Sequence, residues 1–176
     1  MRLVDSPIHG VYVVRGEPVA DERGYFMRFF DADEFKRRGI DPPLVQCSVS
    51  LSHARFTLRG MHYQAAPHEE SKLIRCTRGS AFDVAVDLRP DSPTYLQSFC
   101  MELHAGGSDG VLIPPGCAHG FLTLEPDTEI LYQIGARYAP RYATGVRWND
   151  PAFGIEWPSP PSVISDRDRS FADFEP

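Results

Sequence analysis

The sequence predicts an all-β fold, an antiparallel sandwich or barrel formed by one domain spanning residues 1–176. Segments with apolar side chains at every second position recur along the chain, as expected of half-buried strands. Glycine and proline, 14 and 16 residues respectively, separate these segments as turns would. Many short strands divided by turns are typical of sandwiches and barrels. No internal repeat or linker divides the 176 residues, which suffice for one core.

The expected elements are taken here in chain order. A short helix should begin at Asp31 or Asp33 and end at Gly39, because acidic residues come early, basic residues come late, and glycine often ends a helix. The strands are expected at residues 10–14, 25–30, 58–64, 72–79, 81–88, 95–103, 110–115, 120–124 and 129–135.

Two segments have further features. In AFDVAVDL, alternation places Phe82, Val84, Val86 and Leu88 on one face and Asp83, Ala85 and Asp87 on the other. The second face is polar but small, as in a strand that lines a cavity. The proline-rich tail WPSPPSVISDRDRSFADFEP is expected to form an irregular strap across the surface.

Composition excludes several classes of protein. Contents of 42% apolar and 24% charged residues are ordinary for a soluble globular chain. A net charge of −6 argues against a nucleic-acid-binding face, and no apolar run is long enough to span a membrane. Cys47, Cys76, Cys100 and Cys117 lack metal-ligand spacing, and no signal peptide is evident. We therefore expect reduced thiols in a cytoplasmic protein.

Two histidines lie beside glycine in strand-like segments, His62 in LRGMHYQ and His119 in LIPPGCAHGFLTL. Either one alone is more simply a hydrogen-bonded core residue. Together, the PxGxxH pattern ending at His119 and the earlier histidine-bearing strand resemble the two motifs of the cupin superfamily. That resemblance implies a cupin-type jelly roll, a double-stranded β-helix.

A metal site is not expected. Metal-binding cupins carry HxH in the first motif, whereas this chain reads His62-Tyr63-Gln64. Glu69 or Glu70 offers an oxygen, but a neutral amide is a poor transition-metal ligand compared with imidazole. The residue types instead suit acid–base chemistry, which needs a histidine base with a carboxylate partner and an acid on the opposite face.

Five motifs in order extend the resemblance: LRGMHYQ, KLIRCTRGSAFDVAVDLRPDSPTY, IPPGCAHGFLTL, ILYQIGARYAP and WNDPAFGIEWP. The chain resembles dTDP-4-dehydrorhamnose 3,5-epimerase and its nucleotide-sugar epimerase relatives from about residue 7 to residue 168. The resemblance implies a homodimer that needs no metal or cofactor. It also implies a nucleoside-diphosphate 4-keto-6-deoxy sugar as substrate, inverted at C3, C5 or both through an enolate.

The resemblance also implies roles for individual residues. His62 would remove the proton and Asp168, with Asp166 as a competitor, would pair with it. Tyr132 would be the acid on the opposite face, and Lys72 the cation beside the C4 oxygen. The other implied substrate contacts are Arg23 and Arg59 on the diphosphate, from two subunits, and Phe26, Gln46, Asp83 and His119.

Two stretches depart from the family pattern. GYFMR places Arg28 where the family has a glutamate, and Cys47-Ser48-Val49 replaces Asp-Asn-His. Both stretches are expected near the nucleotide, so the nucleotide carrier stays open. The alternatives are a 3,4-ketoisomerase of the same fold, a metal-dependent cupin oxygenase, and a non-catalytic sugar-nucleotide-binding cupin.

Overall fold

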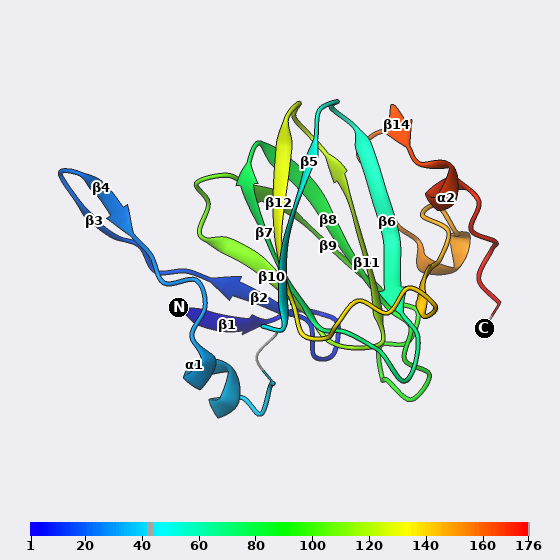
Figure 1. The fold of residues 1–176 in the computed structure, drawn as a ribbon, viewed down its shortest axis with the longest axis horizontal. Helices are drawn as coiled ribbons and strands as arrows, with labels where there is room; N and C mark the ends of the chain where they lie inside the picture. Colours follow the sequence, from blue (N-terminus) through cyan, green and yellow to red (C-terminus); the bar gives the residue numbers. More distant parts are fainter. Residues whose placement is uncertain (42–43, 176) are drawn as a thin grey trace.

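The computed structural model describes residues 1–41 and 44–175, which form two antiparallel sheets packed face to face (Figure 1). The first sheet contains β1 (Arg2–Asp5), β2 (Tyr12–Arg15), β10 (Asp109–Ile113), β7 (Lys72–Arg78), β12 (Thr128–Ile134) and β5 (Gln46–Ser52), in that order across the sheet. The second contains β13 (Ala143–Gly145), β6 (Thr57–Gln64), β11 (Cys117–Thr123), β8 (Ser80–Asp87) and β9 (Ser98–His104), with β14 (Val163–Ile164) parallel to β6. This is the expected jelly-roll arrangement.

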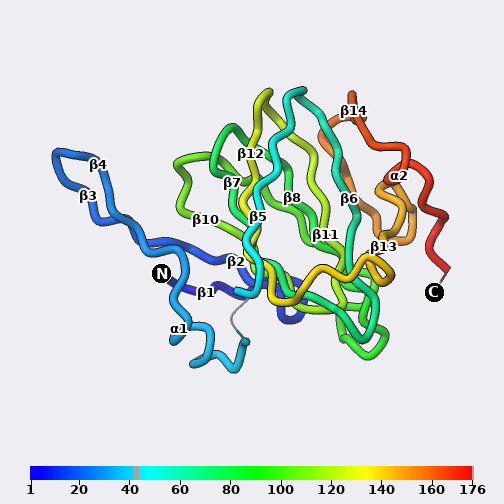
Figure 2. Tube along the Cα trace, in the orientation of Figure 1, coloured from blue at the N-terminus to red at the C-terminus, as the bar shows by residue number. Residues whose placement is uncertain are grey.

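A third, two-stranded sheet stands apart from the barrel. Strands β3 (Val19–Asp21) and β4 (Gly24–Phe26) form a hairpin that projects away from the two large sheets (Figures 1 and 2). Its apolar side chains are exposed: Val19 by 72%, Tyr25 by 52% and Phe26 by 75%. An exposed apolar arm of this kind is typical of a segment that contacts a partner.

The main core lies between the two sheets. Ile74, Val111, Ile113 and Ile130 of the first sheet meet Ala81, Ala85, Leu103 and Phe121 of the second. Both outer faces are also covered. Phe35 of helix α1 (Ala32–Arg37) packs on the outer face of the first sheet against Leu73 and Leu112. The segment from Val146 to Phe174 covers the outer face of the second sheet.

The predicted alternation in residues 81–88 is confirmed. Val84 and Val86 point to the outer face, where Phe153 and Trp157 of the tail cover them. Ala81 and Ala85 point into the core between the sheets, where their small size lets the two layers approach. The predicted helix is also confirmed, because Asp31 caps its N-terminus by accepting from the Asp33 N–H.

Three predicted elements need correction. Of residues 25–30, only Tyr25 and Phe26 belong to a strand, and Phe29 and Phe30 pack beneath α1 instead. The strand expected from residue 95 begins at Ser98, after a turn. The tail is not wholly irregular, since it contains β14 and the short helix α2 (Asp166–Arg169), capped by Ser165. Strands β1, β3, β5, β13 and β14 were not predicted.

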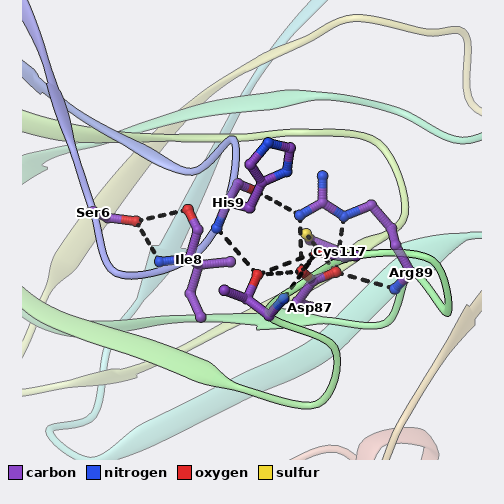
Figure 3. A network of polar contacts seen from close by, with 8 residues as sticks. Ser6, Ile8, His9, Asp87, Arg89 and Cys117 are labelled. Atoms are coloured by element: carbon purple, nitrogen blue, oxygen red, sulfur yellow. Dashed lines mark hydrogen bonds and ion pairs between the residues drawn. The ribbon is translucent and has the colours of Figure 1, made fainter.

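A buried polar network lies at the end of β8 (Figure 3). Asp87, which is 0% exposed, accepts from the Arg89 guanidinium and from the hydroxyls of Ser92 and Thr94. Burial alone would raise the pKa of Asp87, but these hydrogen bonds outweigh it and hold the pKa well below its usual range. Because Arg89 also donates to the His9 carbonyl, the network ties two loops together.

Among the residues that the model describes, no helix is both long and apolar enough to cross a lipid bilayer.

Candidate active site

A cavity of about 690 Å³ opens between the sheets, lined by β5, β6, β7, β11, β12 and the tail. It brings together most of the side chains that the sequence singles out. Of the predicted site residues, Gln46, Arg59, His62, Lys72, His119, Tyr132 and Asp168 line it. Arg23, Phe26 and Asp83 do not. Residues from both sheets and from the tail therefore meet in one space.

His62 and Asp168 form a hydrogen-bonded pair at one wall of the cavity. His62 Nε2 lies 2.6 Å from Asp168 Oδ1, and Asp168 is buried while the His62 side chain is 40% exposed. Burial by itself would raise the pKa of Asp168. The hydrogen bond and charge of His62 and the Gly60 N–H outweigh burial and lower it. The ionised carboxylate accepts only, so Nε2 carries the hydrogen and Nδ1 is left as the basic nitrogen.

The tail places Asp168 beside His62 across 106 residues of sequence. Strand β14 pairs with the beginning of β6 at Thr57 and Leu58, and β13 pairs with the end of β6 from His62 to Gln64. Between them, the Gly60 N–H donates to Asp168 Oδ2 at 3.1 Å. Ser165 caps α2 by accepting from the Asp168 N–H. The aspartate is thereby fixed by its own helix and by β6.

Lys72 begins β7 and forms a buried ion pair. Its Nζ lies 2.9 Å from Glu70 Oε1, and the two side chains are 11% and 7% exposed. The same ammonium donates to the His62 carbonyl at 3.0 Å. Lys72 is thus held directly beside the histidine, and its counter-ion is Glu70, which the sequence suggested only as a metal-binding oxygen.

Tyr132 stands on the sheet that faces His62. It belongs to β12 of the first sheet, whereas His62 belongs to β6 of the second. Its hydroxyl lies 3.2 Å from the Ser50 hydroxyl. Burial is the main reason why the pKa of Tyr132 is raised above its usual value, with the charge of Asp83 adding to the effect. The hydroxyl therefore keeps its proton at neutral pH and is available as an acid.

His119 is the cross-strand neighbour of His62, on β11. Its Nε2 lies 2.8 Å from Asp83 Oδ2, and both side chains are buried. Asp83 lies behind His119 and does not line the cavity, so any effect on a ligand would pass through the histidine. The His119 ring also meets the Tyr132 ring edge-on, with centroids 6.1 Å apart.

Basic and aromatic groups surround the opening. Arg59 donates to the Ser52 hydroxyl and the Leu51 carbonyl, which fixes its guanidinium on the β5 side of the cavity. Gln46 accepts from the Tyr138 N–H. Tyr138 and Arg167, which were not predicted from the sequence, also line the cavity. Arg167 directly precedes Asp168, and that adjacency is the signal that would have indicated it.

Arg23 and Phe26 lie on the projecting hairpin, where Arg23 pairs with Asp21. Arg28 has left the strand and pairs with Asp31 at the start of α1. The hairpin extends away from strands β5, β6 and β12, which line the cavity (Figure 2). One chain therefore does not assemble the predicted arginine pair, Arg23 and Arg59, around one ligand.

Gln64, which stands where metal-binding cupins have the second histidine of HxH, stabilises the fold. The Gln64 amide donates to the His68 and Arg137 carbonyls and accepts from the Ala139 N–H. It anchors two loops and leaves no free ligand atom. Within the described residues, no three His, Cys, Asp or Glu side chains gather as a metal site would require. The expectation that no metal takes part stays a prediction.

Comparison with known proteins gives consistent results. The family model described as dTDP-4-dehydrorhamnose 3,5-epimerase matches residues 5–175. A dTDP-4-dehydrorhamnose 3,5-epimerase from Sinorhizobium fredii is 43% identical over 161 residues, which cover 91% of this chain and 83% of the relative.

Solved structures agree over nearly the whole chain. A dTDP-4-dehydrorhamnose 3,5-epimerase from Elizabethkingia anophelis superposes with a TM-score of 0.95 at 33% identity, covering 99% of this chain and 96% of the other. A 3'-monoepimerase from Streptomyces bikiniensis, in complex with dTDP-quinovose, gives a TM-score of 0.88 at 32% identity, with coverages of 96% and 85%. The cupin-type jelly roll predicted from the sequence is therefore confirmed.

Proposed function

This chain belongs to the dTDP-4-dehydrorhamnose 3,5-epimerase family and is a carbohydrate epimerase, and we propose that it inverts C3, C5 or both in a nucleoside-diphosphate 4-keto-6-deoxy sugar. The name of the family and the dTDP-quinovose bound to the similar monoepimerase support a nucleotide-linked sugar. The similar Elizabethkingia anophelis protein is a 3,5-epimerase and the Streptomyces bikiniensis protein a 3'-monoepimerase, so the proposal covers both one centre and two.

The observation that carries the proposal is the opposed placement of His62 and Tyr132 across one cavity. A ketone at C4 acidifies the neighbouring C–H bonds. His62 takes a proton, and Asp168 stabilises the imidazolium that results. The electron pair moves to the C4 oxygen, where the Lys72 ammonium stabilises the enolate. Tyr132 then returns a proton from the opposite face, which inverts the centre.

Arg59, Arg167 and Tyr138 are proposed to hold the nucleotide part. Guanidinium groups bind diphosphate oxygens through paired hydrogen bonds, and an exposed tyrosine at the rim offers a face on which a base stacks. Tyr138 is 62% exposed and lines the cavity, which supports that role. Gln46 and His119 are proposed as further substrate contacts, with Asp83 acting through His119.

A homodimer is proposed as the working unit. The chain's own cavity lacks Arg23 and Phe26, which lie on the exposed β3–β4 hairpin. A second copy that received this hairpin at its cavity would bury Val19, Tyr25 and Phe26 and gain a guanidinium for the diphosphate.

Residues 1–176 are proposed to act as one catalytic domain, since the proposed base, His62, and its partner Asp168 lie 106 positions apart in the sequence. The free state of all four cysteines supports a cytoplasmic location.

Incubation with dTDP-4-keto-6-deoxyglucose in heavy water tests the reaction, with mass spectrometry and NMR as readouts. Deuterium at C3 and C5 identifies a double epimerase, and deuterium at one centre identifies a mono-epimerase. His62→Ala should reduce exchange by about 10³-fold or more, whereas His53→Ala, a histidine outside the cavity, should not. Tyr132→Phe should retain exchange but lose inversion. Wild-type protein that exchanges no hydrogen with any nucleotide-linked 4-keto sugar would contradict the proposal.

A further inference from the structure

The Lys72–Glu70 pair is a second buried ion pair in the cavity, separate from His62–Asp168. Both side chains are close to nine-tenths buried or more, and Lys72 Nζ and Glu70 Oε1 lie 2.9 Å apart. Asp168 is already committed to His62 and Gly60, so Glu70 serves as the counter-ion of Lys72. Burial of an ammonium without such a partner favours its neutral form.

Glu70 has little to do for the fold. Its Oε2 is buried and has no hydrogen-bond partner among the described residues. A carboxylate oxygen buried without a partner is unfavourable, so a purely structural role would favour an apolar side chain at this position. Lys72 is the one side-chain partner that the described residues give this carboxylate. The position of Glu70 is therefore explained by Lys72.

Two fixed groups restrict the position of the Lys72 ammonium, which carries three N–H donors. One N–H donates to the His62 carbonyl at 3.0 Å, and Glu70 Oε1 lies 2.9 Å from the same nitrogen in an ion pair. Lys72 and His62 both line the cavity. A substrate carbonyl bonded to another N–H of Lys72 would therefore lie near the base.

We propose that Glu70 is a positioning residue that holds the Lys72 ammonium in place for the substrate carbonyl. This inference rests on the proposed function, because the position of Lys72 matters for catalysis only if its ammonium stabilises the enolate. A carboxylate attracts the ammonium more strongly than a neutral acceptor does, so it restricts the positions that the Lys72 side chain can take. Removing the Glu70 charge should therefore lower kcat more than it weakens substrate binding.

Glu70→Gln separates charge from shape. Glutamine fills a similar volume and still offers Lys72 an acceptor oxygen, so the fold should be retained. The other titratable or charged side chains around the cavity are Arg59, His62 and Tyr63 on β6, His119 on β11, Tyr132 on β12, Tyr138, and Arg167 and Asp168 on α2. All of them are unchanged in this variant. Glu69→Gln is the matched control, because Glu69 is the exposed neighbour.

The measurement is kcat and KM, determined separately for epimerisation by the wild type and both variants, with thermal melting as a check on folding. In Glu70→Gln, kcat should fall by about tenfold or more while KM changes little, and both constants of Glu69→Gln should match the wild type. An unchanged kcat in Glu70→Gln, or an equal fall in Glu69→Gln, overturns the inference.

The two proposals fail in different ways. Wild-type protein that is inactive on all nucleotide-linked 4-keto sugars counts against the proposed function. An active wild type whose kcat does not depend on Glu70 leaves that function standing and counts against the positioning role alone.

Discussion

The Asp168 carboxylate accepts from His62 and from the Gly60 N–H, whereas Asp166, in the same short helix, is exposed. Two aspartates of almost identical sequence context therefore have different environments. The buried one faces the cavity and the exposed one faces solvent. This difference makes the pair a matched set for testing whether Asp168 supports the proposed base.

Replacement of Asp168 by Asn should lower kcat by about 10²- to 10⁴-fold, the usual share of a positioned acid–base pair. The imidazolium that forms on His62 would lose its counter-charge, and an amide can donate where the carboxylate only accepts. Asp166→Asn should leave kcat unchanged. Steady-state kinetics of both variants, with circular dichroism as a check, decides the matter. Equal losses in the two would show that the pair is not specific.

Acid should weaken the same contact. The pKa of Asp168 is lower in the folded chain than in the unfolded one. Its contribution to stability is therefore complete above the unfolded-state value and declines as the pH falls toward the folded-state value. Under the same conditions, His62 loses the negative charge of the carboxylate beside it.

The residues of the candidate site were easier to predict from the sequence than the boundaries of the elements. His62, Lys72 and Tyr132 stand in motifs whose residue types already point to acid–base chemistry, and all three line the cavity. The Lys72–Glu70 pair was not predicted. Glu70 lies in the loop before β7, so the direction of its side chain depends on the loop conformation and not on the alternation of a strand. The placement of Asp83 behind His119 was equally invisible in sequence.

Gly60 shows how an element fixes the site. It lies in β6 with φ +134°, and a Cβ there would meet Gly120 Cα at 2.5 Å and the His119 carbonyl oxygen at 3.0 Å. The register of β6 and β11 shifts at this point, between His119 and Phe121. The close approach of the two strands thus sets both histidines, and the same residue donates to Asp168.

Substitution of Gly60 by Ala should therefore destabilise the protein by roughly 2–6 kcal/mol, as backbone strain adds to overpacking. Gly106→Ala is the control, because Gly106 also has positive φ but nothing within 4 Å of its added Cβ. It should cost about 1–2 kcal/mol. Urea denaturation of both variants measures the difference. Similar losses would show that the contact with β11 is unimportant.

At the level of elements, prediction succeeded where the residues at alternate positions of a strand meet two different surroundings. β8 was predicted well because both of its faces are covered, one by the core and one by the tail. Residues 25–30 were also predicted as a strand, but Phe29 and Phe30 pack in the cluster around Phe35 of α1, a tertiary contact that the local pattern does not show. The short strand β14 was missed because its pairing with β6 is a long-range contact.

At the scale of the whole molecule, the cavity is lined by strands of the two large sheets, whereas the apolar β3–β4 hairpin projects away from those sheets (Figure 1). Under the dimer proposal, Arg23 of one subunit serves His62 of the other. The family resemblance implied that Arg23 and Arg59 bind the diphosphate from two subunits, and the projecting hairpin supports that proposal. Such sharing can be tested by complementation.

Arg23→Ala and His62→Ala subunits should each have low activity, and equal mixing after denaturation and refolding should restore it. A mixed dimer would contain one intact site and one site with both lesions. Random pairing therefore predicts about a quarter of wild-type activity per subunit. Measurement of the rate before and after mixing tests this. If the hairpin served its own cavity, mixing would restore nothing.

The tail that carries Asp168 pairs with β6 through two residues in parallel and continues into a four-residue helix. Short elements of this kind open at a free energy well below that of the barrel. The fraction of active enzyme molecules then depends on whether this tail is docked on β6. On warming or in mild denaturant, catalysis should cease while the two sheets are still intact, and it should return as soon as the tail docks again.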